Sequence, residues 1–476
     1  MLTSKALLPE ANPPVVVSQP AVPKAPVSRP LIVLAGSETT SIKDREELQN
    51  PIRKIALFAG LAFLVVRFSA LSELLQYYTG IKFYLLYLFA PLAILGVFVT
   101  GGVGRTLRHN SSKYLLAFFA WMVLATPFST WRGDSVALIT DYGRVGIIML
   151  FVTGGLAMRW EEIRQVFSAM AVVAVANLAA AHFLGRFDNE GRLTISATSN
   201  MGNSNDLGAE LLLVAPFLLF VALDHARNKL LRFSMLPFVL YGLVLVLGTA
   251  SRGCMIALLF VFFFALMRAS PRQRIAALVI GVVLGASVPF LLTGGVLNRL
   301  GSVFGGQQDT SETAESAESS AARMYLLKQS LRYTFQHPLF GVGPGQFPNY
   351  EGGQSRAEGK QGQWKVTHNF MTQISSECGI PALVLMLSSL VSAMMLVGRT
   401  YKQARTRGFT DIANACFCYQ LSMIGYVGSI VFLAQAYHPY LPTMIGLAIA
   451  MSLVAKQHMS AYPIRNSMNA RAQPSY

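Results

Sequence analysis

The sequence predicts an all-α membrane protein: a bundle of about twelve transmembrane helices with one large external loop between the ninth and the tenth. Of its 476 residues, 53% are hydrophobic and only 13% are charged, whereas soluble domains carry about 25% charged residues. Apolar runs long enough to cross a bilayer recur along the chain, and basic residues collect in alternate connections between them. The net charge of +16 is therefore attributed to membrane orientation, and we expect no nucleic-acid partner.

The chain divides into five parts. Residues 1–54 are predicted to be a disordered cytoplasmic tail, because residues 9–30 are rich in Pro, Val and Ala without a repeat. This tail has no basic segment followed by an apolar one, so a signal peptide is not expected. The other parts are the first nine spans (55–294), the external loop (295–377), the last three spans (378–455) and a second cytoplasmic tail (456–476). The predicted spans are about 55–75, 81–100, 113–131, 136–157, 163–184, 207–223, 234–250, 253–268, 275–294, 378–398, 413–434 and 441–455.

Basic residues set the expected orientation. If the N-terminus is inside, every inner connection carries Arg or Lys, and both termini lie in the cytoplasm. The short outer connections then carry only Arg132, Arg186, Arg192 and Arg252. Because these outer arginines depart from the orientation rule, we expect some of them to serve a function. The long loop lies outside in this arrangement.

Three arginines stand out. Arg252 lies in Thr249-Ala250-Ser251-Arg252-Gly253 at membrane depth, where a cation is costly unless it is paired or faces a polar cavity. Arg192 lies in an outer connection rich in Asn, Ser, Thr and Gly. Arg323 lies in a segment, 321–336, whose helical periodicity places an apolar face along one side. That face is made of Met324, Leu327, Leu331 and Phe335.

His368 and Asn369 end the external loop, just before the tenth predicted span. Histidine is the side chain best suited to take a proton near neutral pH, so His368 is the candidate base. Glu377 would lie about 180° from it on a continuous helix, and we exclude it as a partner unless the helix is broken. Asn203 and Asn205 are interpreted as cap or turn residues before the sixth predicted span.

Other motifs receive structural interpretations. His337 and the glycines of Gly341-Val342-Gly343-Pro344-Gly345 form a turn, and they lack the strand-to-helix context of a dinucleotide site. Asp141 and Arg144 are expected to pair on one helix face. The four cysteines show no metal-ligand or disulfide spacing, and packing roles are expected for them. We therefore expect neither a metal nor a cofactor.

These motifs, in this order, resemble the O-antigen ligase and Wzy-type polymerase superfamily of bacterial inner-membrane glycosyltransferases over residues of about 110–455. Four pieces carry the resemblance. They are Gly191-Arg192-Leu193 with Gly202-Asn203-Ser204-Asn205, then Thr249 to Gly253, then Arg323 with His337-Pro338-Leu339-Phe340-Gly341-Val342-Gly343-Pro344-Gly345-Gln346-Phe347, and His368-Asn369 with Gly379.

The resemblance implies a GT-C-like fold in the bacterial inner membrane, with its active site at the periplasmic face. The donor would be a glycan on undecaprenyl diphosphate, and the acceptor would be lipid A–core or a growing glycan. His368 would act as general base. Arg192 and Arg252 would clamp the diphosphate, as planar guanidinium groups match phosphate oxygens, and Arg323 and Asn369 would bind substrate.

Alternatives remain open at this point. The spacing from His368-Asn369 to Gly379 resembles ligases, but Ala382 stands where ligases usually have Gly, Thr or Tyr. A polymerase of O-antigen or exopolysaccharide units would use the same donor and the same residues. Different classes are a transporter of polysaccharide-linked lipid and a non-catalytic scaffold within a polysaccharide complex. Against a transporter, the sequence has no internal repeat, and its candidate residues cluster at the outer face instead of the midplane.

Overall fold

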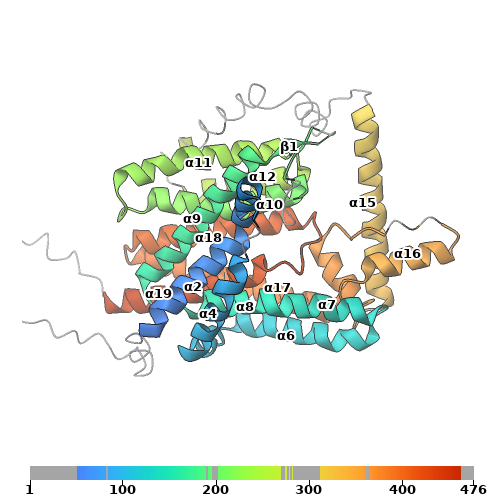
Figure 1. Cartoon of the computed structure of the whole chain (residues 1–476), viewed down its shortest axis with the longest axis horizontal. Coiled ribbons are helices and arrows are strands. Elements are labelled where there is room, and N and C mark those ends of the chain that lie inside the picture. Colours follow the sequence, from blue (N-terminus) through green and yellow to red (C-terminus); the bar gives the residue numbers. More distant parts are fainter. Residues whose placement is uncertain are drawn as a thin grey trace, which may run out of the picture.

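A computed structural model describes residues 51–81, 84–188, 191–195, 202–269, 274, 275, 278, 281, 311–360, 362 and 364–462. Long helices run side by side in a bundle, and α15 lies across one end of it (Figure 1). We call this end the α15 end. The helices are α2 (Pro51–Phe68), α3 (Leu71–Thr79), α4 (Leu85–Val99), α5 (Gly102–Thr106), α6 (Asn110–Ala125), η1 (Thr126–Phe128), α7 (Arg132–Tyr142), η2 (Gly143–Ile147), α8 (Ile148–Gly155), α9 (Trp160–Phe183), α10 (Ser204–Leu223), α11 (Lys229–Gly248), α12 (Arg252–Arg268), α15 (Ser311–Gln336), α16 (Phe347–Ala357), α17 (Phe370–Thr406), α18 (Thr410–Ile430) and α19 (Tyr440–Ala461). Two short antiparallel strands, β1 (Arg186–Phe187) and β2 (Leu193–Thr194), form a hairpin.

Several helices are long and apolar enough to cross a membrane. Within the described residues there are six, or up to seven if the α2–α3 pair, bent by 71°, counts as one span. The six are Arg132–Gly155, Trp160–Phe183, Ser204–Leu223, Lys229–Gly248, Phe370–Thr406 and Tyr440–Ala461. The protein is therefore a multi-pass helical membrane protein. Each span predicted from the sequence overlaps a helix, except 275–294, which lies mostly outside the described residues, as does the tail before residue 51. The number twelve stays a prediction.

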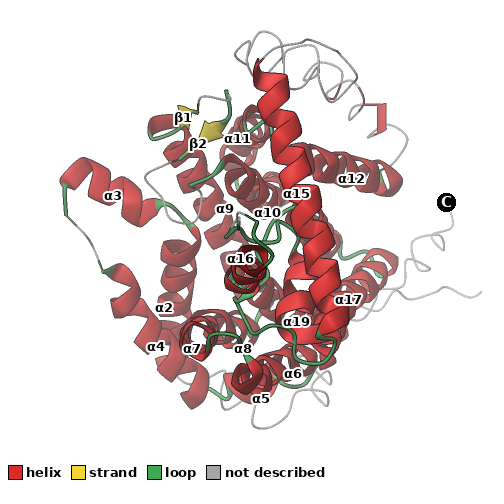
Figure 2. Ribbon diagram, turned by 90° about the vertical axis from the view of Figure 1, so that its right-hand side faces the viewer, coloured by secondary structure: helices red, strands yellow, loops and turns green. Residues whose placement is uncertain are grey.

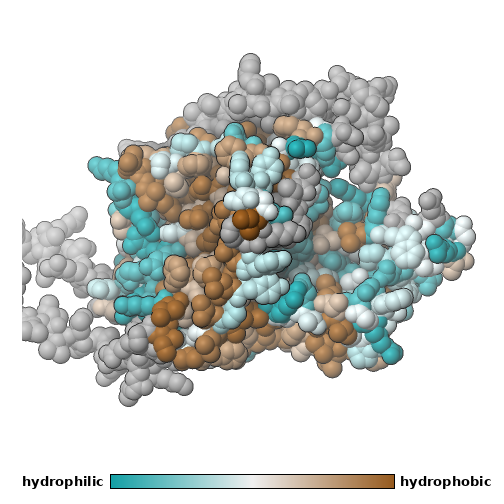
Figure 3. All heavy atoms as spheres, viewed as in Figure 1, coloured by the Kyte–Doolittle hydropathy of each residue, from teal (hydrophilic) through white to brown (hydrophobic). Residues whose placement is uncertain are grey.

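The core lies where α10, α17, α18 and α19 pack together with α9. Hydrophobic side chains cover much of the visible middle of the bundle, and hydrophilic ones gather at its two ends, the one where α15 and α16 lie and the opposite one (Figure 3). The α2–α3 bend leaves backbone groups without helical partners, and the buried side chain of Asn177 forms hydrogen bonds with two of them. Its Oδ1 accepts from the Ala70 N–H at 2.9 Å, and its Nδ2 donates to the Phe68 carbonyl at 3.1 Å. Such groups need partners because lipid offers none.

The helix predicted at 321–336 is present within α15, but its expected apolar face is not the buried one. Leu326, Ser330 and Tyr333 are buried, and α15 packs on α17. Met324, Leu331 and Phe335 are exposed, at 53%, 42% and 74%. The helical periodicity was correct, but the buried side chains lie on another face of α15, where the Thr334 hydroxyl lies 2.8 Å from the Ser375 hydroxyl of α17.

A break in α17 organises the α15 end. Gly379 has φ 86° and ψ 171°, and Pro381 follows two residues later, so helical hydrogen bonding is interrupted there. The carbonyls of α17 that the break leaves without helical partners accept hydrogen bonds from the glycine-rich segment 337–347. The Val342 N–H donates to the Ser376 carbonyl at 2.8 Å, and the Gly343 N–H donates to the Glu377 carbonyl at 2.9 Å. In return, the Ile380 N–H donates to the Pro338 carbonyl at 2.8 Å.

Replacing Gly379 by alanine is expected to destabilise the protein by about 3–5 kcal/mol. A Cβ there would lie 1.9 Å from the Leu339 carbonyl oxygen, in a backbone conformation that side chains rarely adopt. Thermal unfolding in detergent, followed by tryptophan fluorescence, measures the effect. Gly104→Ala is the matched control, because nothing lies within 4 Å of its added Cβ. Equal Tm values for the two variants would show that the break is not a constraint on folding.

Candidate functional site at the α15 end

His368 lies in the segment that leads into α17. It is one of three non-glycine residues with positive φ in the described chain, at φ 51°, a conformation that the surroundings must hold in place. Burial, together with the positive charges of Arg323 and Lys365, lowers the pKa of the His368 imidazole to about 4. The imidazole is therefore neutral across the physiological range, and the neutral form is the one that accepts a proton.

Asn369 caps α17. Its Oδ1 accepts hydrogen bonds from the Met371 N–H at 2.9 Å and the Thr372 N–H at 3.1 Å. The Thr367 hydroxyl donates to the Asn369 carbonyl at 3.1 Å. The cap fixes where α17 begins, and so it fixes the backbone that carries His368. The side-chain oxygen of Asn369 is committed to the helix end, which leaves its amide nitrogen as the group with which it could meet a substrate.

The structure brings Arg323 and His368 together. The Arg323 charge, on α15, acts on the His368 imidazole, which lies 45 residues later in the chain. Figure 2 looks onto this end of the bundle, with α15 and α16 in front. The long loop of the sequence is thus folded back over the start of α17, and its described part contains the two helices α15 and α16.

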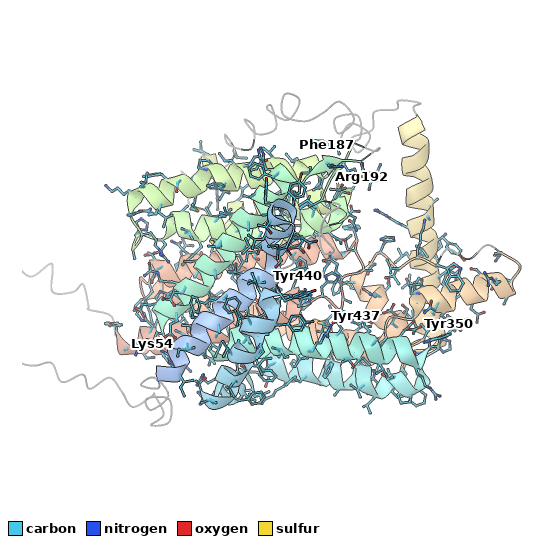
Figure 4. The ribbon with its side chains drawn as sticks, in the orientation of Figure 1. Lys54, Phe187, Arg192, Tyr350, Tyr437 and Tyr440 are labelled. Carbon is cyan, nitrogen blue, oxygen red and sulfur yellow. The ribbon has the colours of Figure 1, made fainter. Side chains whose placement is uncertain are left out.

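Arg192 lies in the turn of the β1–β2 hairpin. The Asp188 N–H donates to the Arg192 carbonyl at 3.0 Å, and the Arg192 N–H donates to the Asp188 Oδ1 at 2.8 Å. Figure 4 shows Arg192 toward the end where α15 lies, with Lys54 at the opposite end. The hairpin therefore presents Arg192 toward the end of the bundle where α15 lies.

Arg252 is the first residue of α12. Ser251 caps this helix, with its Oγ accepting from the Cys254 N–H at 3.4 Å, and Ala250 before it has φ 46°. The Cys254 Sγ lies 3.6 Å from the Asn205 carbonyl, which ties the start of α12 to the start of α10. Asn203 caps α10, as the sequence predicted, with its Oδ1 accepting from the N–H groups of Asn205 and Asp206. The two motifs around Arg192 and Arg252 thus meet at neighbouring helix starts.

A connection that the sequence analysis overlooked links these helix starts to α17. Residues 431–439, here called the strap, join α18 to α19. The Gln435 Nε2 donates to the Asp206 Oδ1 at 2.5 Å, and the Tyr426 hydroxyl donates to the Gln435 Oε1 at 2.9 Å. The Ala436 N–H donates to the Gln373 Oε1 at 3.1 Å. The signal in the sequence was the polar interruption Gln435-Ala436-Tyr437-His438 between two apolar runs.

Glu377 is buried under the strap. Its Oε2 accepts from the Tyr437 hydroxyl at 2.7 Å and from the Gly345 N–H at 3.1 Å, while its Oε1 accepts from the Phe347 N–H at 3.4 Å. Tyr437 lies near the middle of the molecule in Figure 4. The carboxylate therefore holds the glycine-rich segment and the strap to α17. This is a positioning role, separate from the proton acceptor that His368 could be.

Replacing Glu377 by alanine is expected to lower the free energy of unfolding by about 2–3 kcal/mol, because buried donors lose their acceptor. Glu377→Gln, which keeps one acceptor oxygen, should fall between wild type and alanine. Exposed Glu161 provides the control, Glu161→Ala. Thermal unfolding of wild type and the three variants in one detergent ranks their stabilities. If Glu377→Ala is as stable as Glu161→Ala, Glu377 does not hold these segments together.

The fold and this end together define a multi-pass helical membrane protein in which a neutral histidine at the start of α17 lies in the field of Arg323 on α15. Residues 237–387 match the family model described as O-antigen ligase. The match confirms the resemblance to the O-antigen ligase and Wzy-type superfamily in the part of the chain that carries Arg252, Arg323 and His368. Arg192 lies before the matched residues. No curated protein matches the chain closely enough to count as a relative.

Within the described residues, no three or more His, Cys, Asp or Glu side chains are grouped as they would need to be to hold a metal ion. The four cysteines are buried and free, in agreement with the packing roles expected for them. Asp141 and Arg144 form the expected ion pair, with the Arg144 Nη2 at 2.7 Å from the Asp141 Oδ1.

Proposed function

We propose that this protein transfers a glycan from undecaprenyl diphosphate to an acceptor glycan, with His368 as the general base. The observation that carries the proposal is the imidazole of His368, kept neutral by burial and held beside Arg323 within the segment that matches O-antigen ligase. The residues of this end supply a base and cations. Those are the two needs of a displacement at a sugar carbon that carries a diphosphate leaving group.

The reaction is a single displacement. The acceptor oxygen forms a bond to the anomeric carbon, and the bond from that carbon to the diphosphate oxygen breaks. The electron pair leaves with undecaprenyl diphosphate, and the hydroxyl proton passes to the free imidazole nitrogen of His368. Arg192, Arg252 and Arg323 stabilise the charge that develops on the diphosphate, which guanidinium groups bind in a bidentate manner. No metal ion is needed for these steps.

The donor also tunes the base. A pKa near 4 makes the free imidazole a weak proton acceptor. A bound diphosphate brings negative charge near Arg323 and Lys365, and opposite charge favours the protonated imidazole. Donor binding should therefore raise the pKa of His368 toward its usual range. The base becomes effective only when the substrate that it serves is in place.

The preferred acceptor is the core glycan of lipid A, as in a ligase, because of the spacing between His368-Asn369 and Gly379. Ala382 favours the second candidate, a polymerase that extends glycan repeat units on undecaprenyl diphosphate. Both readings place the protein in the bacterial inner membrane, with cytoplasmic termini and a periplasmic active site. Membrane lipids surround it in either case.

The test offers the purified protein one labelled donor and one added acceptor, and a second donor molecule can serve as the alternative acceptor. A labelled undecaprenyl-diphosphate glycan is incubated with lipid A–core, and the products are separated by gel and by mass spectrometry. Label on the core identifies a ligase, and longer glycans on undecaprenyl diphosphate identify a polymerase. If the donor stays intact with wild-type protein across several donor glycans, the transferase proposal fails, and the transporter or scaffold takes its place.

A further inference from the structure

Two hollows adjoin at the C-terminal end of α15. One has a volume of about 340 Å³ and is lined by polar and aromatic side chains. The other has a volume of about 370 Å³ and is lined mainly by apolar groups. His337 belongs to the walls of both. Each volume lies within the range of ligand sites, about 300–1,000 Å³. The function proposed above uses neither of them.

The polar hollow has the chemistry of a sugar site. Its walls include Arg332, Gln336, His337, Tyr350, Gln354 and Glu358. The His337 Nε2 lies 3.0 Å from the Tyr350 hydroxyl, and Tyr333 packs edge-on against the Tyr350 ring at 4.8 Å, so the aromatic wall is fixed. The amides of Gln336 and Gln354 are exposed. Amide, guanidinium and carboxylate groups can donate to and accept from ring hydroxyls, and an aromatic face covers the apolar face of a sugar.

The apolar hollow lies against the bundle. Phe128 and Phe340 line it and stack at 4.4 Å, and Trp121 of α6 stacks on Phe340 at 5.4 Å. Phe128 is 62% exposed, and Leu339 is 59% exposed. Further exposed apolar side chains lie on α6, at Val123 and Leu124, and near the C-terminal end of α15, at Phe335. An exposed apolar surface of this kind, at the end of a helix that packs in a membrane bundle, suits a lipid chain.

Only an amphiphile fills both hollows. We propose that they bind the acceptor as a glycolipid, with sugars in the polar hollow, an acyl chain in the apolar one, and His337 at the junction. This inference rests on the proposed function, which supplies the reason for an acceptor at this end. Gln336 and Arg323 are 13 residues apart on α15, roughly 20 Å at the helical rise per residue. The headgroup is therefore an extended oligosaccharide that runs along α15 from the hollows to His368.

The test measures binding to the full-length protein, without donor, of three probes: lipid A–core, the free core oligosaccharide and lipid A without core. The polar hollow is altered by the double substitution Gln336→Ala and Gln354→Ala, and the apolar hollow by Phe128→Ala. The double variant should weaken binding of lipid A–core and of the oligosaccharide by roughly tenfold. Phe128→Ala should weaken binding of lipid A–core and of lipid A. Lys328→Ala, an exposed change on α15, is the control and should bind all three probes as wild type does.

Equal affinities for lipid A–core in wild type, both variants and the control overturn the inference. The variants change exposed side chains, so their unfolding temperatures should equal that of wild type. Equal unfolding temperatures exclude a folding defect as the cause of weaker binding. Failure of the inference differs from failure of the function. If glycan transfer occurs and the acceptor KM is unchanged in both variants, the acceptor binds elsewhere and the function stands. If lipid A–core binds as described but no donor is ever consumed, the site stands and the transfer proposal falls.

Discussion

Replacement of His368 by alanine is expected to lower the rate of glycan transfer by about 10²- to 10⁴-fold, the usual contribution of a positioned general base. The loss should appear in kcat, because the base acts on the proton only as the new bond forms. Binding of the donor, measured separately, should change little. A neighbouring change, Lys365→Ala, serves as the control. It removes a positive charge near the imidazole and should raise the pKa of His368 without removing the base.

The pH dependence gives a second readout of the same residue. The pKa of His368 lies near 4 in the free protein, below the usual value of 6.5. The base is therefore neutral and active above pH 4, and kcat/KM should fall only as the pH drops through about 4. The kcat profile reports the donor complex, where the diphosphate raises the pKa, so its acid limb should lie at higher pH. Coincident limbs in the two profiles would exclude tuning by the donor, and an acid limb that persists in His368→Ala would assign it to another group.

Replacement of Arg252 by alanine is expected to cost about 10²- to 10³-fold in transfer, comparable to losing one charge-stabilising group in a preorganised site. Arg252→Lys should recover only part of the rate, because an ammonium keeps the charge but lacks the planar pair of donors. Arg192 should behave in the same way. Arg186→Ala offers a matched control, since this exposed arginine lies on the same β1–β2 hairpin as Arg192. If Arg186→Ala loses as much transfer rate as Arg252→Ala, positive charge acts in general at this end, and a specific diphosphate clamp is contradicted.

Sequence reasoning reached much of the fold because a bilayer constrains a chain strongly. Apolar runs gave helices at every predicted span that the structure describes, and Asn203 capped α10 as expected. The motifs around Arg252 and His368 were identified from residue type and position, and the family match covers both. The sequence analysis assigned Arg323 and His368 to the same site but did not predict how the chain brings them close. The fold-back of α15 over α17 does this.

The remainder depended on contacts between segments far apart in the chain. The apolar stripe of α15 predicted a buried face, but burial depends on the segments that pack on the helix, and Leu326, Ser330 and Tyr333 are buried instead. From the sequence, Glu377 was considered only as a partner for His368, because helical geometry predicts contacts only between residues on the same helix. Its actual partners, Tyr437 and the Gly345 N–H, lie 60 and 32 residues away. The break at Gly379 was likewise invisible in periodicity, since helical backbone resumes after Gly379 and continues to Thr406.

The measurement that tests the central claim most directly is the stoichiometry of the reaction in proteoliposomes. A donor labelled on both the glycan and the lipid is supplied with acceptor, and free undecaprenyl diphosphate and transferred glycan are quantified together. The account predicts that wild-type protein releases one undecaprenyl diphosphate for each glycan transferred, only when acceptor is present, and that His368→Ala releases almost none. Movement of intact donor across the membrane without release of undecaprenyl diphosphate, at equal rates in both proteins, would show a transporter and contradict the assignment of His368.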